Sequence, residues 1–427
     1  MAVRTSNRQR ERQVERPAGR RKYSDLLNGH TGTNGAMLKV CFITREYPPN
    51  VYGGAGVHIK NLARELAQVM GVEVRCFGDQ DLREGRLRVK GYQAWNRMGE
   101  GAEPKFNSAF GTFSTDLSIV RDPLDADIVH GHTWYAAMAG FMAKVLYDVP
   151  LVVTVHSLEP LRPWKEEQLG RSYCLSAWIE RVALEAADRV IAVSSQSKGE
   201  ILTHFNIPPE RVTVIHNGID PRTWKPSPAR ATRQAYGIEG DYILFVGRVS
   251  RQKGMVHLLE AMKHVDPYVR LVCCTSAADT PELDVEIAAK VKETPRCLWI
   301  NTWLHEEQYI ELYSHCTVFA CPSVYEPFGI INLEAMACER PVVASAVGGI
   351  PEVVVPEKTG LLVPPADPRA LADALNRVLR DRATAHAMGL AGRRRVEEQF
   401  SWAAISARTH RMYQELLKEK EMSTSHA

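Results

Sequence analysis

Short apolar runs of strand length alternate with stretches of helical periodicity from Met37 to about residue 417 of this 427-residue chain. This alternation limits the fold more than any other feature, because parallel sheets need crossover helices whereas sandwiches and bundles do not. One series of strand-like runs ends at Val193, and a second begins at Tyr242. A single sheet of about a dozen strands would be unusual. The sequence therefore predicts an α/β protein with two separate Rossmann-like sheets.

The strand-like runs and the clearest helical stretches can be placed on the sequence. In the first series, we expect helices at residues 56–69 and 178–187, and strands at residues 38–44, 72–77, 128–130, 151–156 and 190–193. In the second series, we expect strands at residues 242–247, 270–274, 297–301, 318–322 and 342–344.

A segment rich in turn formers, from Asn217 to Pro228, separates the two series. We expect it to be a hinge, with the domain boundary near residue 220. After Pro364 the periodicity is helical only, and no strand follows the amphipathic stretch at residues 400–417. The expected parts are a basic tail, an N-terminal domain, a C-terminal domain and a final helical segment, at residues 1–36, 37–220, 221–399 and 400–427, respectively.

The formal charge is distributed unevenly along the chain. Residues 1–36 carry a net charge of +5, which leaves −2 for the remainder of a chain whose total is +3. This Arg-rich stretch has few large apolar residues, so we expect it to be disordered, and Met37 is an alternative start. The body has no excess of positive charge, and no apolar run approaches the ~20 residues of a spanning helix. We therefore expect a cytoplasmic protein without nucleic-acid or membrane partners, and the sequence leaves homo-oligomer formation open.

Three patterns bear on metal binding. Nine cysteines contain no C-x-x-C pair, which argues against a disulfide framework and a structural zinc site. Asp125 and Asp127 form a D-x-D pattern, but it precedes a strand, so we interpret it as a strand lead-in. His130 and His132 form an H-x-H at a strand end, where further metal ligands are not evident and a polar rim for an acceptor is favoured. We expect neither a metal nor a cofactor.

Two motifs of the second series suit a phosphorylated sugar. The run at residues 318–322 leads through a Gly-containing loop into a helix, whose positive end and backbone N–H groups would face a phosphate. Glu326 lies in that loop and Glu334 about one turn inside the helix, so both carboxylates can face one crevice. Arg248 and Lys253 are five residues apart at a strand end and a helix start, a spacing that lets both cations contact one diphosphate leaving group.

The first series supplies a loop and a histidine at strand ends. Gly53 and Gly54 belong to a glycine loop that permits close backbone approach, although a G-x-G-x-x-G dinucleotide motif is absent. His156 follows an apolar strand at the end where α/β sheets bind ligands. Polar and aromatic side chains nearby are candidates for an acceptor site, with cations suited to an anionic acceptor and aromatic rings to a neutral glucan: Trp134, Tyr135, Glu159, Arg162, Trp164 and Lys165.

The E-x7-E pattern from Glu326 to Glu334 resembles that of retaining GT-B glycosyltransferases in the group that includes glycogen and sucrose synthases. The segments at residues 247–254 (GRVSRQKG) and 53–56 (GGAG) agree with it. More narrowly, residues 44–58, 130–135 and 156–165 are similar to the actinobacterial-type glycogen synthases, some of which make maltose 1-phosphate. The resemblance extends from Met37 to about Leu417.

The resemblance implies a GT-B fold, with two Rossmann-like domains around a deep cleft and a last helix that returns to the N-terminal domain. It implies glucose transfer, with retention, from ADP-glucose or UDP-glucose to an α-1,4-glucan or glucose 1-phosphate. Lipid or sucrose-phosphate-type acceptors, a GT-B nucleotide-sugar epimerase and a non-catalytic nucleotide-binding protein are the alternatives. The implied catalytic residues are His156, Arg248, Lys253 and Glu326. The other implied donor contacts are Gly53, Gly54, Phe328, Gly329, Ile330, Ile331 and Glu334, and the implied acceptor contacts are His132, Trp134, Tyr135, Glu159, Arg162 and Lys165.

Overall fold

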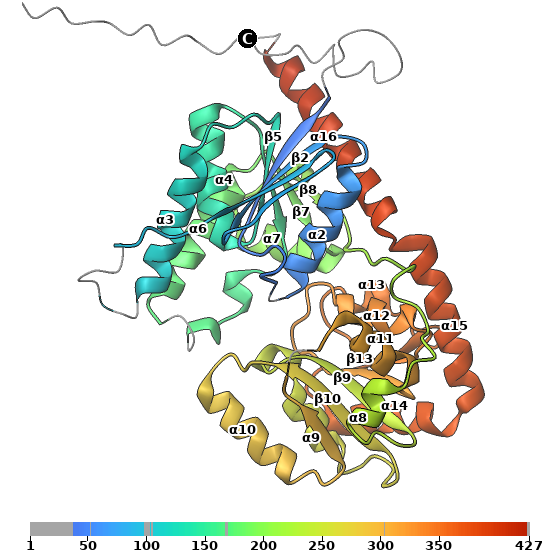
Figure 1. Ribbon diagram of the computed structural model, residues 1–427. Helices are drawn as coiled ribbons and strands as arrows, with labels where there is room; N and C mark the ends of the chain where they lie inside the picture. The colour runs from blue at the N-terminus through green and yellow to red at the C-terminus, as the bar shows by residue number, and fades with distance from the viewer. Residues whose placement is uncertain are drawn as a thin grey trace, which may run out of the picture.

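The structure is a computed structural model that describes residues 37–424 except 52, 98–102, 104–105, 167–169 and 303. The expected disordered tail, residues 1–36, lies outside the described residues. The chain forms two lobes, each built on one sheet with helices on both faces (Figure 1). Among the described helices, none combines the length and the apolar character needed to cross a membrane.

The N-terminal lobe contains an eight-stranded sheet of order β3-β4-β2-β1-β5-β6-β7-β8, parallel except for the β3–β4 pair. Its strands are β1 (Lys39–Thr44), β2 (Gly71–Phe77), β3 (Asp81–Glu84), β4 (Leu87–Tyr92), β5 (Ile128–His132), β6 (Leu151–Val155), β7 (Arg189–Ala192) and β8 (Val212–Val214). Its helices are α2 (Gly54–Leu66), α3 (Asn107–Arg121), α4 (Trp134–Tyr147), α6 (Ser172–Ala186) and α7 (Ser195–His204), with short 3₁₀ turns η2 (Glu159–Leu161) and η3 (Pro209–Arg211).

The C-terminal lobe contains a six-stranded parallel sheet of order β11-β10-β9-β12-β13-β14. Its strands are β9 (Tyr242–Arg248), β10 (Arg270–Ser276), β11 (Cys297–Ile300), β12 (Val318–Cys321), β13 (Val342–Ser345) and β14 (Gly360–Val363). Its helices are α8 (Ala231–Ala235), α9 (Met255–Ala261), α10 (Pro281–Lys292), α11 (Glu306–His315), α12 (Ile330–Ala337), α13 (Ile350–Val353), α14 (Pro368–Arg380) and α15 (Arg382–Gln399), with the 3₁₀ turn η4 (Arg251–Lys253). The last helix of the chain is α16 (Trp402–Thr424).

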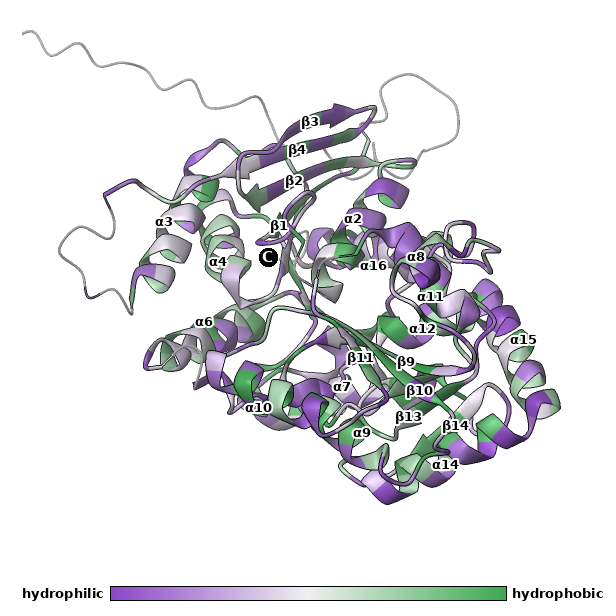
Figure 2. Cartoon of the chain, turned by 60° about the horizontal axis from the view of Figure 1, so that its bottom comes forward, coloured by the Kyte–Doolittle hydropathy of each residue, from purple (hydrophilic) through white to green (hydrophobic). Residues whose placement is uncertain are grey.

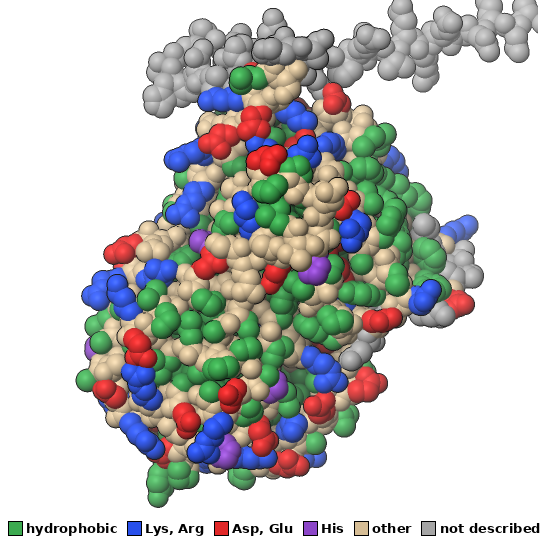
Figure 3. All heavy atoms as spheres, turned by 180° about the vertical axis from the view of Figure 1, so that it is seen from behind, with side chains coloured by type: hydrophobic (Ala, Val, Ile, Leu, Met, Phe, Trp, Pro, Cys, Tyr) green, Lys and Arg blue, Asp and Glu red, His purple; other side chains and the backbone are tan. Residues whose placement is uncertain are grey.

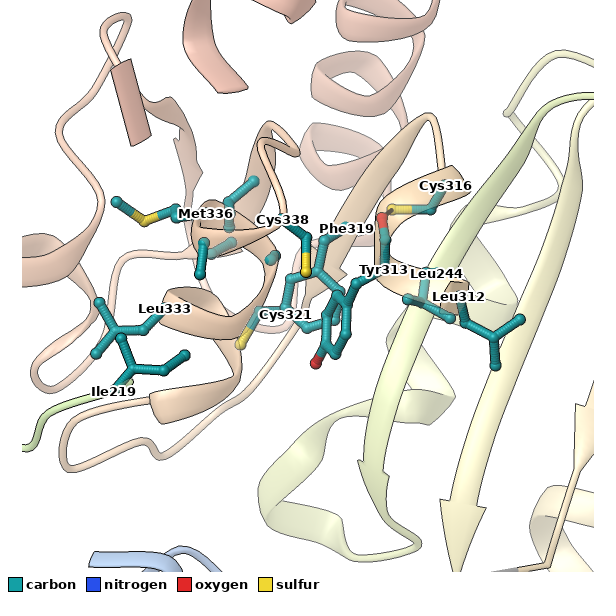
Figure 4. Packing of buried hydrophobic residues seen from close by; sticks show 14 of the residues in the cluster. Ile219, Leu244, Leu312, Tyr313, Cys316, Phe319, Cys321, Leu333, Met336 and Cys338 are labelled. Atoms are coloured by element: carbon teal, nitrogen blue, oxygen red, sulfur yellow. Dashed lines mark hydrogen bonds between the residues drawn. The ribbon is translucent and has the colours of Figure 1, made fainter. Parts of the chain in front are cut away.

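Apolar strands buried on both faces hold the C-terminal lobe together. Strands β9 and β10 are apolar along most of their length, whereas α14 and α15 have hydrophilic outer faces (Figure 2). Tyr313 of α11 and Met336 of α12 pack with Leu244 of β9 and Phe319 of β12 (Figure 4). Each fully buried side chain of this kind contributes about 1.5–3 kcal/mol. All nine cysteines are free, and most pack as small apolar side chains.

The chain crosses between the lobes at two places that lie side by side. The backbone N–H of Ile219 donates to the carbonyl oxygen of Phe400 at 2.8 Å. Beyond this point, α16 runs along the N-terminal lobe and contacts α2 (Figure 1). Its side chains Trp402, Ile405 and Tyr413 are buried in the apolar core of the first sheet. We propose these two crossings as the domain limits.

Three differences from the expected elements have local causes. The expected helix at residues 56–69 begins and ends earlier, as α2, and leaves Val69 beyond its end with 55% of its surface exposed. The β3–β4 hairpin was not expected, because β3 has the polar sequence DLRE and is exposed at all four residues. Strands β8 and β14 are also additions, each only three or four residues long.

Basic and acidic side chains are interspersed with apolar ones on the face seen in Figure 3. No single sign of charge dominates this face, as it does on proteins that bind nucleic acid through a basic patch.

Candidate active site

The site begins where parallel strands of the N-terminal lobe end together. In the sheet register, His132 of β5 lies beside Thr44 of β1 and Thr154 of β6. His156 follows Thr154 by two residues and therefore points to the same face of the sheet as His132. The carboxyl ends of β1, β5 and β6 thus gather at one edge, which is where α/β sheets bind their ligands.

The loops at this edge touch the C-terminal lobe. Gly54, at the start of α2, lies so close to Ile330 that an added Cβ would be 3.4 Å from the Ile330 side chain. The backbone N–H of Leu158 donates to the hydroxyl of Tyr325 at 3.2 Å, and the Trp164 ring packs edge-on near Tyr325. The structure therefore places the glycine loop and the loop after β6 opposite the loop that carries Glu326.

Two cations of the C-terminal lobe are paired with carboxylates. Lys253 Nζ lies 2.5 Å from Glu326 Oε2, and both side chains are largely buried, with 15% and 8% of their surface exposed. The hydroxyl of Ser323 donates to the same carboxylate oxygen at 3.2 Å. Arg248 Nη1 lies 2.7 Å from Asp279 Oδ1. The expected diphosphate-binding cations are thus held in place by neighbouring carboxylates.

Close backbone contacts hold these loops together. Gly254 has φ 64°, and a Cβ there would lie 2.1 Å from the carbonyl oxygen of Pro322, so this position requires glycine. Gly348 has φ 56°, and a Cβ there would lie 1.7 Å from the carbonyl oxygen of Glu326. The Gly349 N–H donates to that same oxygen at 3.0 Å. Both the Lys253 turn and the Glu326 loop are therefore fixed from their backbones.

Glu334 and the residues before it begin the helix α12. The hydroxyl of Tyr313 donates to Glu334 Oε2 at 2.9 Å, and burial raises the pKa of Glu334 to about 7. Gly329, with φ 92°, is the N-cap of α12. Phe328 is only 2% exposed and packs against His216, so only its backbone can contact a ligand. The contact of the backbone of residues 328–331 with the phosphate and sugar of the donor remains a prediction.

Four histidines lie close together beneath the loops at the carboxyl edge of the first sheet. His132 Nδ1 lies 3.1 Å from His156 Nε2. The His58 ring, from α2, lies 4.9 Å from the His156 ring, and His58 Nδ1 is 2.6 Å from Asn217 Oδ1. His130 is bonded on both ring nitrogens, to the hydroxyls of Tyr413 and Thr154. Burial lowers the pKa of His58 to about 4 and the pKa values of His132 and His156 well below their usual range, so these rings are neutral near pH 7.

Two residues expected to contact the acceptor are buried in the structure. His132 was expected on a polar rim but is fully buried, because its strand lies in the middle of the sheet under α2. Glu159 was expected among the charges near the mouth of the crevice but is 1% exposed, because the chain turns as η2 and packs against α6. Glu159 accepts a hydrogen bond from the Ser176 hydroxyl at 2.9 Å, and its N–H donates to Glu180 Oε2 at 2.9 Å. Both residues therefore lie beneath the site, where their hydrogen bonds to neighbouring residues of the N-terminal lobe stabilise it.

The other expected acceptor residues are partly accessible or lie beside the C-terminal lobe. Arg162 Nη1 donates to the Ser157 hydroxyl at 2.9 Å. Burial is the main cause that lowers the pKa of Lys165 to about 8, and the positive charge of Arg162 is the second. The charges of Asp279 and Arg248, in the C-terminal lobe, also act on the Lys165 side chain. Lys165 of the N-terminal lobe therefore lies near Arg248 and Asp279 of the C-terminal lobe. Trp134 and Tyr135, at the start of α4, are half-buried and stack at a centroid distance of 4.0 Å.

Sequence reasoning missed His58, Asn217, Asp279 and Tyr325. His58 ends a segment already noted for its resemblance, and Tyr325 adjoins Glu326. Asp279 is 31 residues from Arg248 and gave no signal of its own.

The D-x-D pattern lies at the opposite end of the first sheet from these groups. Asp127 accepts the backbone N–H of Lys39 at 2.8 Å, and Asp125 pairs with the Lys39 side chain. Both aspartates therefore precede β5 and bind Lys39, which lies at the amino end of the neighbouring strand β1.

Comparisons with known proteins agree with this architecture. Residues 52–223 match the family model described as Glycosyltransferase Family 4, and residues 230–395 match the model described as Glycosyl transferases group 1. Over 395 residues the chain is 46% identical to an α-maltose-1-phosphate synthase of Mycobacterium tuberculosis, an alignment that covers 89% of this chain and 100% of the relative.

Solved structures share the fold. Sucrose-phosphate synthase from Thermosynechococcus elongatus matches with a TM-score of 0.75 at 26% identity, over 90% of this chain and 100% of that one. HepE of Anabaena in complex with UDP-glucose matches with a TM-score of 0.71 at 21% identity, over 88% of this chain and 100% of that one, and so supports the fold alone. The chain therefore belongs to the family 4 glycosyltransferases with the GT-B fold, in the group that includes the α-maltose-1-phosphate synthases.

Proposed function

We propose that the enzyme transfers glucose from a nucleotide sugar, with retention of the α configuration, to the 4-hydroxyl of glucose 1-phosphate. ADP-glucose is the proposed donor, with UDP-glucose as the second choice, and an α-1,4-glucan is the alternative acceptor. The observation that carries the proposal is the paired Lys253 and Glu326, which lie with Arg248 opposite the strand end that bears His156.

The donor would lie mainly against the C-terminal lobe. Lys253 and Arg248 would contact the diphosphate, and Glu334 would accept hydrogen bonds from the ribose hydroxyls. Glu326 would accept hydrogen bonds from the 3- and 4-hydroxyls of glucose. Gly53 and Gly54 would approach the diphosphate from the other lobe. As the bond from the anomeric carbon to the phosphate oxygen breaks, the leaving group gains negative charge, so fixed cations stabilise the transition state more than the bound substrate.

Retention without an obvious nucleophile suggests attack from the front face. The acceptor oxygen would bond to the anomeric carbon on the side from which the nucleoside diphosphate departs. The departing phosphate oxygen would take the acceptor proton, so that no further base is needed. His156, neutral because of its burial, would contact the glucose 6-hydroxyl and the β-face of the anomeric centre.

The charges next to the cleft edge support an anionic acceptor. Lys165 lies near Arg248 of the opposite lobe and near Arg162 of its own lobe, and Arg162 and Lys165 would contact the phosphate of glucose 1-phosphate. The relative from M. tuberculosis is named for maltose 1-phosphate, which glucose transfer to glucose 1-phosphate would produce. The stacked Trp134 and Tyr135 would instead favour a glucan, because sugar rings pack on aromatic faces.

The test is to incubate the protein with ADP-glucose or UDP-glucose, each with glucose 1-phosphate or with glycogen, and to measure nucleoside diphosphate release and products. We expect maltose 1-phosphate as the main product. Arg162→Ala and Lys165→Ala should raise the KM for glucose 1-phosphate with little change in glycogen elongation. The control Lys263→Ala removes an exposed lysine in the turn after α9, where it pairs with Glu260 of that helix.

Two results would contradict the proposal. Equal loss of both activities in the Arg162 and Lys165 variants would assign these residues to the donor or to folding. Donor turnover to an isomeric nucleotide sugar without any acceptor would indicate the epimerase alternative.

A further inference from the structure

Three histidines from three elements place ring nitrogens around one point. His58 comes from α2, His132 from β5 and His156 from the loop after β6, and one nitrogen of each lies within 4.8 Å of the others. The H-x-H of the sequence lacked further ligands, and the fold supplies two from elsewhere in the chain. His130, the other member of the H-x-H, has both nitrogens occupied by Tyr413 and Thr154.

The hydrogen bonds around these rings leave nitrogens free to coordinate. His58 Nδ1 lies 2.6 Å from Asn217 Oδ1, an acceptor, so the ring proton is on Nδ1 and the lone pair is on Nε2. Within the described part of the chain, His58 Nε2 and His132 Nε2 are buried without a hydrogen-bond partner. His58 would coordinate through Nε2, whereas His132 would keep its ring proton on Nε2 and coordinate through Nδ1, the atom that lies near His156. Metal-binding histidines usually donate their second N–H to an oxygen acceptor in this way.

The spacing also suits a tetrahedral cation. Two nitrogens about 2.0–2.1 Å from a tetrahedral zinc ion are about 3.3 Å apart. The separation of 3.1 Å between His132 Nδ1 and His156 Nε2 is close to this value. The His58 nitrogen lies within 4.8 Å of the other two and has to move toward them by up to about 1.5 Å.

We propose that His58, His132 and His156 bind one Zn²⁺ ion, with a water or substrate oxygen as the fourth ligand. Binding rests on the geometry alone. A second part of the proposal, that Zn²⁺ inhibits glucose transfer, rests on the proposed function, because His156 would then be unavailable to the glucose.

Binding can be measured by calorimetric titration of the untagged full-length chain with ZnCl₂, with Co²⁺ absorption as a report of nitrogen ligands. We expect one equivalent to bind. His156→Ala and His58→Gln should each weaken binding by more than about 100-fold, because loss of an outer partner alone costs about 10- to 100-fold. Asn217→Ala should therefore weaken binding by about 10- to 100-fold. The matched control is His386→Gln, at an exposed histidine of α15.

Unchanged affinity in the His156 and His58 variants would overturn the site, as would the lack of any one-equivalent binding to the wild-type chain. His156 is the least buried of the three, so its replacement should disturb folding least. His156→Ala therefore tests the site even if the His58 variant does not fold. Inhibition is measured separately, as transfer activity with ZnCl₂ and its recovery with EDTA. Binding that depends on the three histidines but leaves activity unchanged would keep the site and refute the proposed contact between His156 and the glucose.

Discussion

Replacement of Lys253 by alanine tests the proposed donor site most directly. The ammonium group is held 2.5 Å from Glu326 and has 15% of its side-chain surface exposed. Its position is therefore set before a donor binds, and little reorganisation is needed when the leaving group gains charge. The substitution removes this cation and leaves the Glu326 carboxylate, among the residues that the structure describes, with the Ser323 hydroxyl as its polar partner at 3.2 Å.

The size of the effect follows from Coulomb's law. A unit charge about 3 Å from a phosphate oxygen interacts by about 5 kcal/mol at an effective dielectric constant of about 20. If roughly half a unit of charge develops in the transition state, the loss is about 2.5–3 kcal/mol, or about 100-fold in turnover. The unpaired Glu326 repels the leaving group and adds to this, so we expect a loss of about 10²- to 10³-fold.

The assay is nucleoside diphosphate release at saturating donor and acceptor. Arg248→Ala should behave like Lys253→Ala, and Lys263→Ala should retain wild-type turnover because Lys263 is exposed and pairs with Glu260 on the surface. Circular dichroism and thermal unfolding would show that both site variants fold. A folded Lys253→Ala enzyme with near wild-type turnover would refute the assignment of Lys253 to the diphosphate.

Four further outcomes are expected. Deletion of residues 1–36 should leave activity within about twofold, because that stretch has few large apolar residues to pack on the body, and an insoluble product would contradict this. Glu334, with its pKa raised to about 7 by burial, is ionised above that pH and protonated below it, so donor affinity should fall as the pH drops. The fall should be about tenfold between pH 8 and pH 6 and absent in Glu334→Gln, as measured by donor titration. Treatment with EDTA should leave activity intact, because two cations and a helix N-terminus would already face the proposed diphosphate site; loss that Mn²⁺ restores would count against this. Scattering from the truncated chain should show a smaller radius of gyration with nucleoside diphosphate and acceptor than without, since the contact between Gly54 and Ile330 must open to admit a donor; identical profiles would argue against closure.

Local patterns in the sequence were sufficient to predict the fold class. Strand and helix periods depend on neighbouring residues only, so the apolar runs that became β1, β6, β9 and β12 were visible without a structure. The polar β3 has no such pattern and was missed. The turn that carries Lys253 was also visible, because Gly254 is required where the backbone approaches Pro322.

The sequence by itself therefore determined the alternation of strands and helices and the short motifs that begin or end them. Tertiary structure decided which distant groups meet, because sheet order and register are set by packing across the whole lobe. It paired Arg248 with Asp279, buried His132 in the middle of the first sheet, and brought His58 from α2 to His156. The hydrophobic periodicity of a short segment does not indicate which distant residues it will contact. The partners of a side chain and its exposure could therefore be known only from the folded molecule.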